Sequence, residues 1–170
     1  MLTIARKFRI TLLALALFLA VVSSGWALEI GETLPEFTIE TLDGGNLSRA
    51  ALAGKPALLV FWNTWCPDCM RELPVIDRLA RQFVPRGLAV LAINTAINDS
   101  ERRARAYWDK SAYIFPSGFD DGFDVGQAFA VRGVPTIFLV DPGGVVTYKQ
   151  AKIPADIEER LSKLVSKGQP

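Results

Sequence analysis

The sequence predicts an α/β fold in which helices flank both faces of a mixed central sheet. The chain of 170 residues is 50% hydrophobic and 22% charged, which is typical of a single globular domain with a buried core. Apolar runs of strand length alternate with segments of helical periodicity, and the chain ends in a hairpin and a helix. This alternation favours helices packed against a sheet over two sheets packed together.

Apolar runs bounded by turn residues predict the strands. The first is an edge strand over residues 37–42, which ends at the turn signal Asp43-Gly44-Gly45. Continuous apolar runs, as found in strands buried on both faces, occupy residues 57–62, 88–94 and 136–140. The turn signal Asp141-Pro142-Gly143-Gly144 then predicts a hairpin with a last strand over residues 145–150.

Helical spacing of apolar residues predicts the helices that connect these strands. They cover residues 67–84, 100–112 and 123–129. A terminal helix is expected to begin at Pro154, because proline is favoured in the first turn of a helix. The apolar residues of this terminal helix share one face and are Ile157, Leu161, Leu164 and Val165.

The first 27 residues are predicted to lie outside the domain, which then covers residues 28–170. A basic segment (6–9) precedes an apolar stretch (10–22), and Gly25-Trp26-Ala27 offers the small residues that a signal peptidase requires. An uncleaved membrane anchor is the alternative, because the uncharged stretch is nearly as long as the roughly 20 residues of a spanning helix. Both interpretations place the domain in the periplasm or another extracytoplasmic compartment.

Composition excludes several classes of function. Without residues 1–27 the chain loses three of its 19 basic residues and none of its 18 acidic ones, so a basic face for nucleic acid is not expected. The absence of histidine excludes Ser-His and Cys-His catalysis, histidine metal sites and the haem-attachment motif. We expect no metal and no cofactor. The expected protein is a monomer that contacts a membrane only through its N-terminus.

The motif Trp65-Cys66-Pro67-Asp68-Cys69 contains both cysteines of the chain, at the junction of a buried strand and a helix. A C-x-x-C at such a junction places two sulfurs one helical turn apart, within disulfide reach. The free N–H groups and the dipole of the helix N-terminus favour a thiolate, which is the form that attacks disulfides. Cys66 is the expected nucleophile, and Cys69 is expected to resolve the mixed disulfide.

Two other uses of the motif agree less well with the sequence. A zinc site needs four ligands, and two cysteines without histidine leave the rest to carboxylates. A purely structural disulfide that closes a two-residue loop would constrain the unfolded chain little. Redox exchange is the better interpretation.

The segment from Gly54 to Pro74, which contains this motif, resembles the thioredoxin-like family of TlpA, ResA and DsbE (also called CcmG). The segments 34–37 and 131–141 are also similar to that family, so the resemblance covers nearly all of the exported domain. It implies a thioredoxin-like fold and a role in keeping extracytoplasmic cysteines reduced, including those of apocytochrome c before haem attachment. It also implies protein thiols or disulfides as substrates and a membrane thiol transporter of the DsbD or CcdA kind as electron donor.

The resemblance assigns substrate-binding roles around the cysteines. Pro135, preceded by Val134, matches the family's cis-proline, whose loop lies beside the disulfide and presents backbone to an incoming peptide. Trp65 resembles the tryptophan that covers the site, although a position in the core is the alternative for so large a side chain. The expected substrate-binding residues are Trp65, Pro67, Val134 and Pro135.

Glu72 matches an acid that this family places just after the motif, and we expect it to act as a base. It follows Cys69 by three residues on the helix and could take the proton of that thiol, directly or through water. A solvated helix carboxylate is the alternative. Thioredoxin itself has a buried acid on the preceding strand, where this chain has Val60, which leaves Glu72 as the nearest candidate base.

Two competing functions fit the residues less well. A peroxiredoxin-like thiol peroxidase shares the fold, but its T-x-x-C pattern is not met, because Asn63 occupies the threonine position and Thr64 comes one residue late. A non-enzymatic copper chaperone of the Sco type would need C-x-x-x-C and a distant histidine, and both are missing.

Asp68, between the two cysteines, predicts a reductant rather than a donor of disulfides. Its carboxylate disfavours the Cys66 thiolate by like-charge repulsion, whereas strong oxidants owe their potential to a stabilised reduced form. No histidine is present to compensate, and Arg71 is expected on the following turn.

Overall fold

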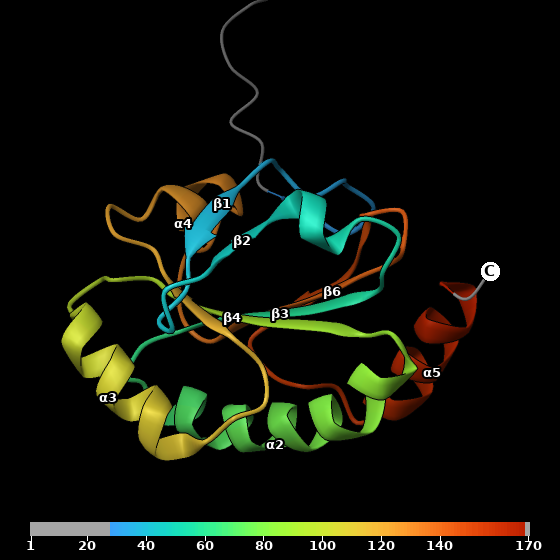
Figure 1. The fold of residues 1–170 in the computed structure, drawn as a ribbon. Helices are drawn as coiled ribbons and strands as arrows, with labels where there is room; N and C mark the ends of the chain where they lie inside the picture. Colours follow the sequence, from blue (N-terminus) through green and yellow to red (C-terminus); the bar gives the residue numbers. More distant parts are fainter. Residues whose placement is uncertain (1–27, 169–170) are drawn as a thin grey trace, which may run out of the picture.

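A mixed five-stranded sheet is the centre of the computed structural model, which describes residues 28–168 (Figure 1). In sheet order its strands are β5 (Ser117–Phe119), β4 (Ala89–Asn94), β3 (Ala57–Trp62), β6 (Thr136–Val140) and β7 (Val146–Gln150). Strands β3, β4 and β5 are parallel, whereas β6 pairs antiparallel with both β3 and β7. The predicted mixed sheet and its terminal hairpin are confirmed. The predicted leader, residues 1–27, lies outside the described residues.

Helices cover both faces of this sheet, as predicted. One face is covered by α2 (Pro67–Phe83), α3 (Glu101–Ser111) and α5 (Ile157–Lys167) (Figure 1). The other face is covered by α4 (Asp124–Ala128) and by a hairpin of β1 (Thr38–Glu40) and β2 (Asn46–Ser48). Short 3-10 helices, η1 (Arg49–Leu52) and η2 (Val84–Arg86), precede β3 and follow α2. None of the helices between residues 28 and 168 is both long enough and apolar enough to cross a membrane.

The alternation of side chains along β3 explains its continuous apolar run. Leu58, Val60 and Trp62 pack into the cluster beneath α2, whereas the residues between them pack into the cluster beneath α4. Every residue of β3 is 0% exposed, because successive side chains of a strand point to opposite faces and both faces are covered. The strand that leads into the cysteine motif is therefore fixed on both sides.

The short strands β2 and β5 were not predicted, and two predicted elements differ from the structure. The first strand is not an edge of the central sheet: β1 pairs with β2 in a separate two-stranded sheet, and a single bridge between Thr41 and Gly118 links it to β5. The last helix begins at Ile157 rather than Pro154, because the Ile157 N–H donates to the Pro154 carbonyl in a preceding turn.

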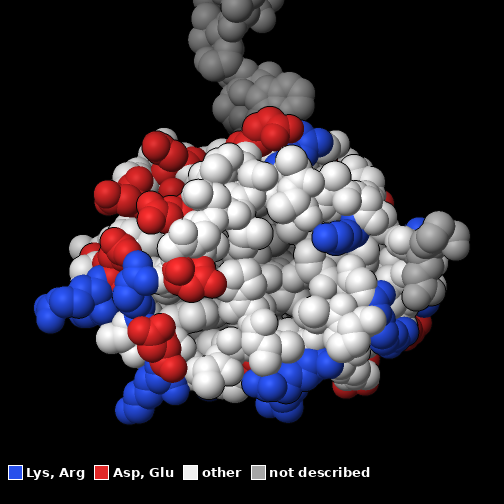
Figure 2. Space-filling model, viewed as in Figure 1, with Lys and Arg blue, Asp and Glu red and all other residues white. Residues whose placement is uncertain are grey.

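Acidic and basic side chains are unevenly distributed on the visible face of the molecule. In Figure 2 acidic side chains gather over β1 and α4, and basic side chains lie mainly along the side formed by α2 and α3. Two of the basic side chains on α3 are ion-paired, Arg103 with Asp99 and Arg105 with Glu101, the latter at 2.5 Å. The basic residues on this face therefore do not form one continuous patch.

Candidate active site

The two cysteines form a disulfide at the N-terminus of α2, with their Cα atoms 5.3 Å apart. Cys66 is the N-cap residue and Pro67 is the first helical residue, a position that suits proline because its missing N–H has no helical partner there. The Cys66 sulfur accepts a hydrogen bond of 3.1 Å from the Cys69 N–H. Cys66 is 3% exposed and Cys69 0%, so the outer position of the disulfide belongs to Cys66.

The loop before β6 lies beside this disulfide. The Val134–Pro135 peptide bond is cis, which confirms the predicted conformation. The Val134 carbonyl oxygen lies 3.5 Å from the Cys66 sulfur. Pro135 is buried and Val134 is half-buried.

Trp65 directly precedes Cys66 and does not belong to the core. It is 50% exposed, and its indole N–H donates to the Ile97 carbonyl at 2.9 Å. Together with Ile97, Phe123 and Val134 it lines a mainly apolar cavity of about 250 Å³. The alternative of a buried structural tryptophan is therefore wrong.

Glu72 lies one helical turn beyond Cys69 on α2 and is half-buried. Its carboxylate accepts a hydrogen bond of 3.1 Å from the Ile153 N–H, in the segment between β7 and α5. Glu72 is thus a fixed carboxylate and not a freely solvated one. Its role as a base stays a prediction.

Arg71 lies on the turn of α2 that follows Asp68, as expected, and pairs with it. The two side chains form an ion pair one turn apart on α2, and both are largely exposed, Asp68 at 52% and Arg71 at 70%. Exposed pairs of this kind are weak, but the guanidinium offsets part of the carboxylate's field. Arg71 is thus a partly compensating cation on the following turn of α2, and it reduces the repulsion that Asp68 exerts on a Cys66 thiolate.

A buried polar network behind the cysteine loop was missed by the sequence reasoning. The Asn63 amide donates to the Asn94 side chain at 3.2 Å and accepts from the Thr95 hydroxyl at 2.7 Å. The Asn94 amide donates in turn to Asp99 at 2.9 Å. The sequence did contain a signal for this network, because polar residues follow β3 and end β4. The carboxyl ends of neighbouring parallel strands meet at one edge of a sheet, so these side chains could be expected to lie close together.

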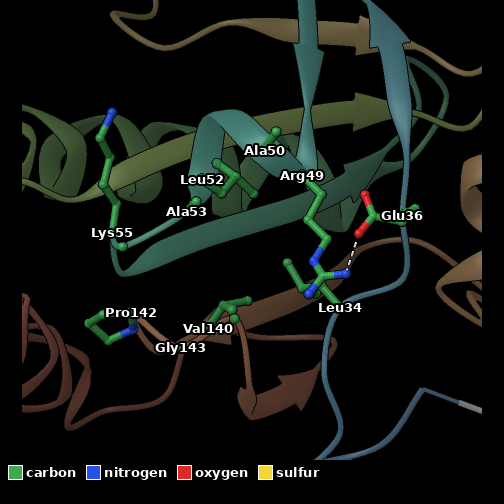
Figure 3. A pocket seen from close by; sticks show the side chains of 12 residues that line it. Leu34, Glu36, Arg49, Ala50, Leu52, Ala53, Lys55, Val140, Pro142 and Gly143 are labelled. Carbon is green, nitrogen blue, oxygen red and sulfur yellow. Dashed lines mark hydrogen bonds and ion pairs between the residues drawn. The ribbon is translucent and has the colours of Figure 1, made fainter.

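A second cavity, of about 320 Å³, lies at the other end of β3 and is separate from the disulfide (Figure 3). Arg49 and Glu36 form an ion pair at its rim, and Leu34, Lys55 and Pro142 also line it. The wall contains no cysteine. Between residues 28 and 168 we find no group of three or more side chains able to ligate a metal ion.

Comparisons with known proteins agree with this geometry. Residues 30–149 match the model of the AhpC/TSA family. The thiol-disulfide oxidoreductase ResA of Geobacillus kaustophilus is 30% identical over 142 residues, which cover 81% of this chain and 79% of that protein. ResA of Halalkalibacterium halodurans is 32% identical over 116 residues, 68% of this chain but just under two thirds (65%) of that protein.

The solved structures support the fold. A candidate thiol:disulfide interchange protein DsbE from Chlorobium tepidum superposes with a TM-score of 0.72 at 24% identity, covering 84% of this chain and 99% of that one. The thioredoxin-like fold is thereby confirmed. The chain belongs to the AhpC/TSA family, and it is a thioredoxin-like homologue of the thiol-disulfide oxidoreductases named ResA.

Proposed function

We propose that the chain reduces protein disulfides by dithiol–disulfide exchange at Cys66 and Cys69. The observation that supports this most directly is the position of the Cys66 sulfur, at the N-terminus of α2 and 3.5 Å from the carbonyl beside a cis-proline. The helix N-terminus favours the thiolate, and the cis-proline loop offers backbone to a peptide. The homology to ResA proteins supports the same reaction.

In this reaction the Cys66 thiolate attacks one sulfur of a substrate disulfide. A mixed disulfide forms, and the first substrate sulfur leaves as a thiolate. Cys69 then gives its proton to Glu72, directly or through water, and attacks the Cys66 sulfur. The second substrate sulfur leaves, so the substrate gains two electrons and the Cys66–Cys69 disulfide forms.

Substrate would lie next to the Cys66 sulfur, across a surface formed by Trp65, Pro67, Val134 and Pro135. The exposed Trp65 and the apolar cavity beside it favour an unfolded or extended segment with apolar side chains near its cysteine. Extracytoplasmic cysteines, including those of apocytochrome c, are the proposed substrates. A membrane thiol transporter of the DsbD or CcdA kind is the proposed donor, and residues 1–27 would export or anchor the domain.

Trapping in the native cell tests this function. A Cys69→Ser variant lacks the resolving thiol, so substrates should remain covalently attached to Cys66 and be released by a reducing agent. A Cys66→Ser/Cys69→Ser double variant is the control and should retain none. Absence of any thiol-releasable adduct on Cys69→Ser would contradict the proposal.

The two competing functions have direct assays. Rapid peroxide consumption by the purified domain would favour the peroxidase, whose disulfide chemistry begins with a sulfenic acid. Formation of a tight copper complex on titration would favour the copper chaperone.

A further inference from the structure

Asp99 is a buried carboxylate that the exchange reaction does not use. It lies in the segment between β4 and α3, and its side chain is 0% exposed. A charge in such a place is costly unless hydrogen bonds compensate for the lost water. The identity of its partners therefore shows what the side chain holds in place.

The partners occupy both carboxylate oxygens of Asp99. Thr64 donates two hydrogen bonds, from its N–H to Oδ2 at 2.7 Å and from its hydroxyl to Oδ1 at 2.8 Å. The Asn94 amide donates to Oδ2 and the Ser100 N–H to Oδ1, each at 2.9 Å. The guanidinium Nε of Arg103, in the first turn of α3, lies 3.4 Å from Oδ1.

These bonds keep Asp99 ionised. Burial raises the pKa of the Asp99 carboxyl, but the hydrogen bonds from Asn94, Thr64 and Ser100 together outweigh burial and lower that pKa below its ordinary value. At neutral pH the contacts with Thr64 are therefore charge-assisted, and hydrogen bonds of this kind are stronger than neutral ones.

Thr64 lies two residues before Cys66, so Asp99 acts on the loop that carries the nucleophile. Trp65, between them, donates its indole N–H to the Ile97 carbonyl in the same segment as Asp99. Three hydrogen bonds thus join residues 64–65 to residues 97–99. Asn63, at the start of the loop, is bound separately to Asn94 and Thr95, so the bonds to residues 97–99 act on the part of the loop nearest Cys66.

We propose that Asp99 is a positioning residue for the Cys66 nucleophile. By binding the N–H and hydroxyl of Thr64, it fixes the turn that places the Cys66 sulfur at the N-terminus of α2 and beside Val134. The inference rests on the proposed exchange reaction at Cys66. Asp99 needs no contact with substrate for this role, because a misplacement of about 1 Å at a reacting atom can cost roughly 100-fold in rate.

The test compares Asp99→Asn with a matched control, Asp77→Asn. Asp77 is also a largely buried carboxylate, 14% exposed, and it also joins two distant segments, accepting from the Ile114 N–H at 3.0 Å. Like Asp99 it is paired with an arginine four residues later, Arg81. It lies about two helical turns along α2 from Cys69, so it can report stability loss without contact with the cysteine loop.

Two quantities are measured on each reduced variant. The first is the rate of insulin reduction, and the second is the pH midpoint of Cys66 alkylation by iodoacetamide, with the alkylated cysteine identified by peptide mass spectrometry. Asp99→Asn should reduce insulin at least about tenfold more slowly and shift the alkylation midpoint by about half a pH unit or more. Asp77→Asn should keep the rate of insulin reduction within twofold of wild type and leave the alkylation midpoint unchanged, even if it lowers Tm as much as Asp99→Asn does. The proposal is overturned if Asp99→Asn keeps both values, or if the two variants lose them equally.

Thr64→Val and Thr64→Ser keep the test decisive if Asp99→Asn does not fold. Valine removes the hydroxyl that donates to Asp99, whereas serine retains it, so the valine variant should show the slower reaction and the shifted midpoint. Equal behaviour of the two variants would overturn the proposal. If the wild-type protein does not reduce insulin but Asp99→Asn still shifts the midpoint, the proposed function fails while the positioning role stands.

Discussion

At the scale of single residues, the two cysteines are expected to differ in reactivity because only Cys66 lies at the outer position of the disulfide. Cys66→Ala should abolish insulin reduction, whereas Cys69→Ala should still form a mixed disulfide, since it retains the nucleophile. Alkylation of the reduced protein at neutral pH checks the assignment. Equal rates at the two thiols would count strongly against it.

Glu72 is expected to assist the resolving step. Glu72→Gln removes the base but keeps an oxygen that can accept the hydrogen bond from the Ile153 N–H, so the fold should persist while release from a trapped mixed disulfide slows by about 10²-fold or more. Glu158→Gln, an exposed carboxylate early in α5, is the control and should not change the rate. A wild-type rate and pH profile for Glu72→Gln would show that this carboxylate has no part in the proton transfer.

At the scale of elements, α2 holds the site through its buried face. Leu73 is 0% exposed and packs one turn after Cys69, so Leu73→Ala should lower the free energy of unfolding by about 2–5 kcal/mol. Gln82, exposed on the same helix, is the control, and Gln82→Ala should stay within about 0.5 kcal/mol. Urea unfolding of the two variants measures the difference. A similar small effect of both would mean that α2 is not held by its core contacts.

The segment between β4 and α3 should make stability depend on pH. The pKa of Asp99 is lowered in the folded protein, so its contribution is fully present above the ordinary aspartate pKa of about 3.9 and is lost as pH falls through the lowered value. The loss of stability in this acid range should be smaller in Asp99→Asn than in the wild-type protein. Unfolding curves measured from pH 6 down to pH 2 check this, and identical pH dependence of the two proteins would contradict it.

The sequence predicted the long elements well and the short ones poorly. β3, β4, β6 and α2 were found because their apolar patterns extend over five or more residues. β5, with only Ser117-Gly118-Phe119, has too little pattern to be recognised alone, and it forms because β4 offers a parallel partner. The short strand β1 was found but misplaced, since pairing depends on a partner that three-residue patterns do not reveal.

The candidate site was predictable where residues are adjacent in the chain and less so where the fold brings them together. Cys66, Cys69 and Trp65 follow from one motif, and the position of Pro135 beside the disulfide followed from the family resemblance. The contact between Thr64 and Asp99 joins residues 35 positions apart, so it depends on the parallel pairing of β3 and β4. The pairing of Arg71 with Asp68 was within reach of the sequence, because residues three apart on a helix are neighbours.

At the scale of the whole molecule, the central prediction is that the protein passes electrons to its substrates and so acts as a reductant rather than as a donor of disulfides. The chain offers two opposing influences on a Cys66 thiolate: the N-terminus of α2 stabilises it, and the carboxylate of Asp68 disfavours it. The Asp68–Arg71 pair weakens the second influence but is largely exposed and therefore screened. No histidine is present to stabilise the thiolate in the way a strong oxidant requires. We therefore expect the disulfide form to be the more stable one.

The measurement that tests this claim most directly is the reduction potential of the Cys66–Cys69 pair. The purified domain is equilibrated with glutathione buffers of known ratio, and the fraction of disulfide is measured after acid quenching and alkylation. A reductant should give a potential near that of thioredoxin, about −270 mV. A potential near that of DsbA, about −120 mV, would contradict the assignment and identify the protein as a donor of disulfides.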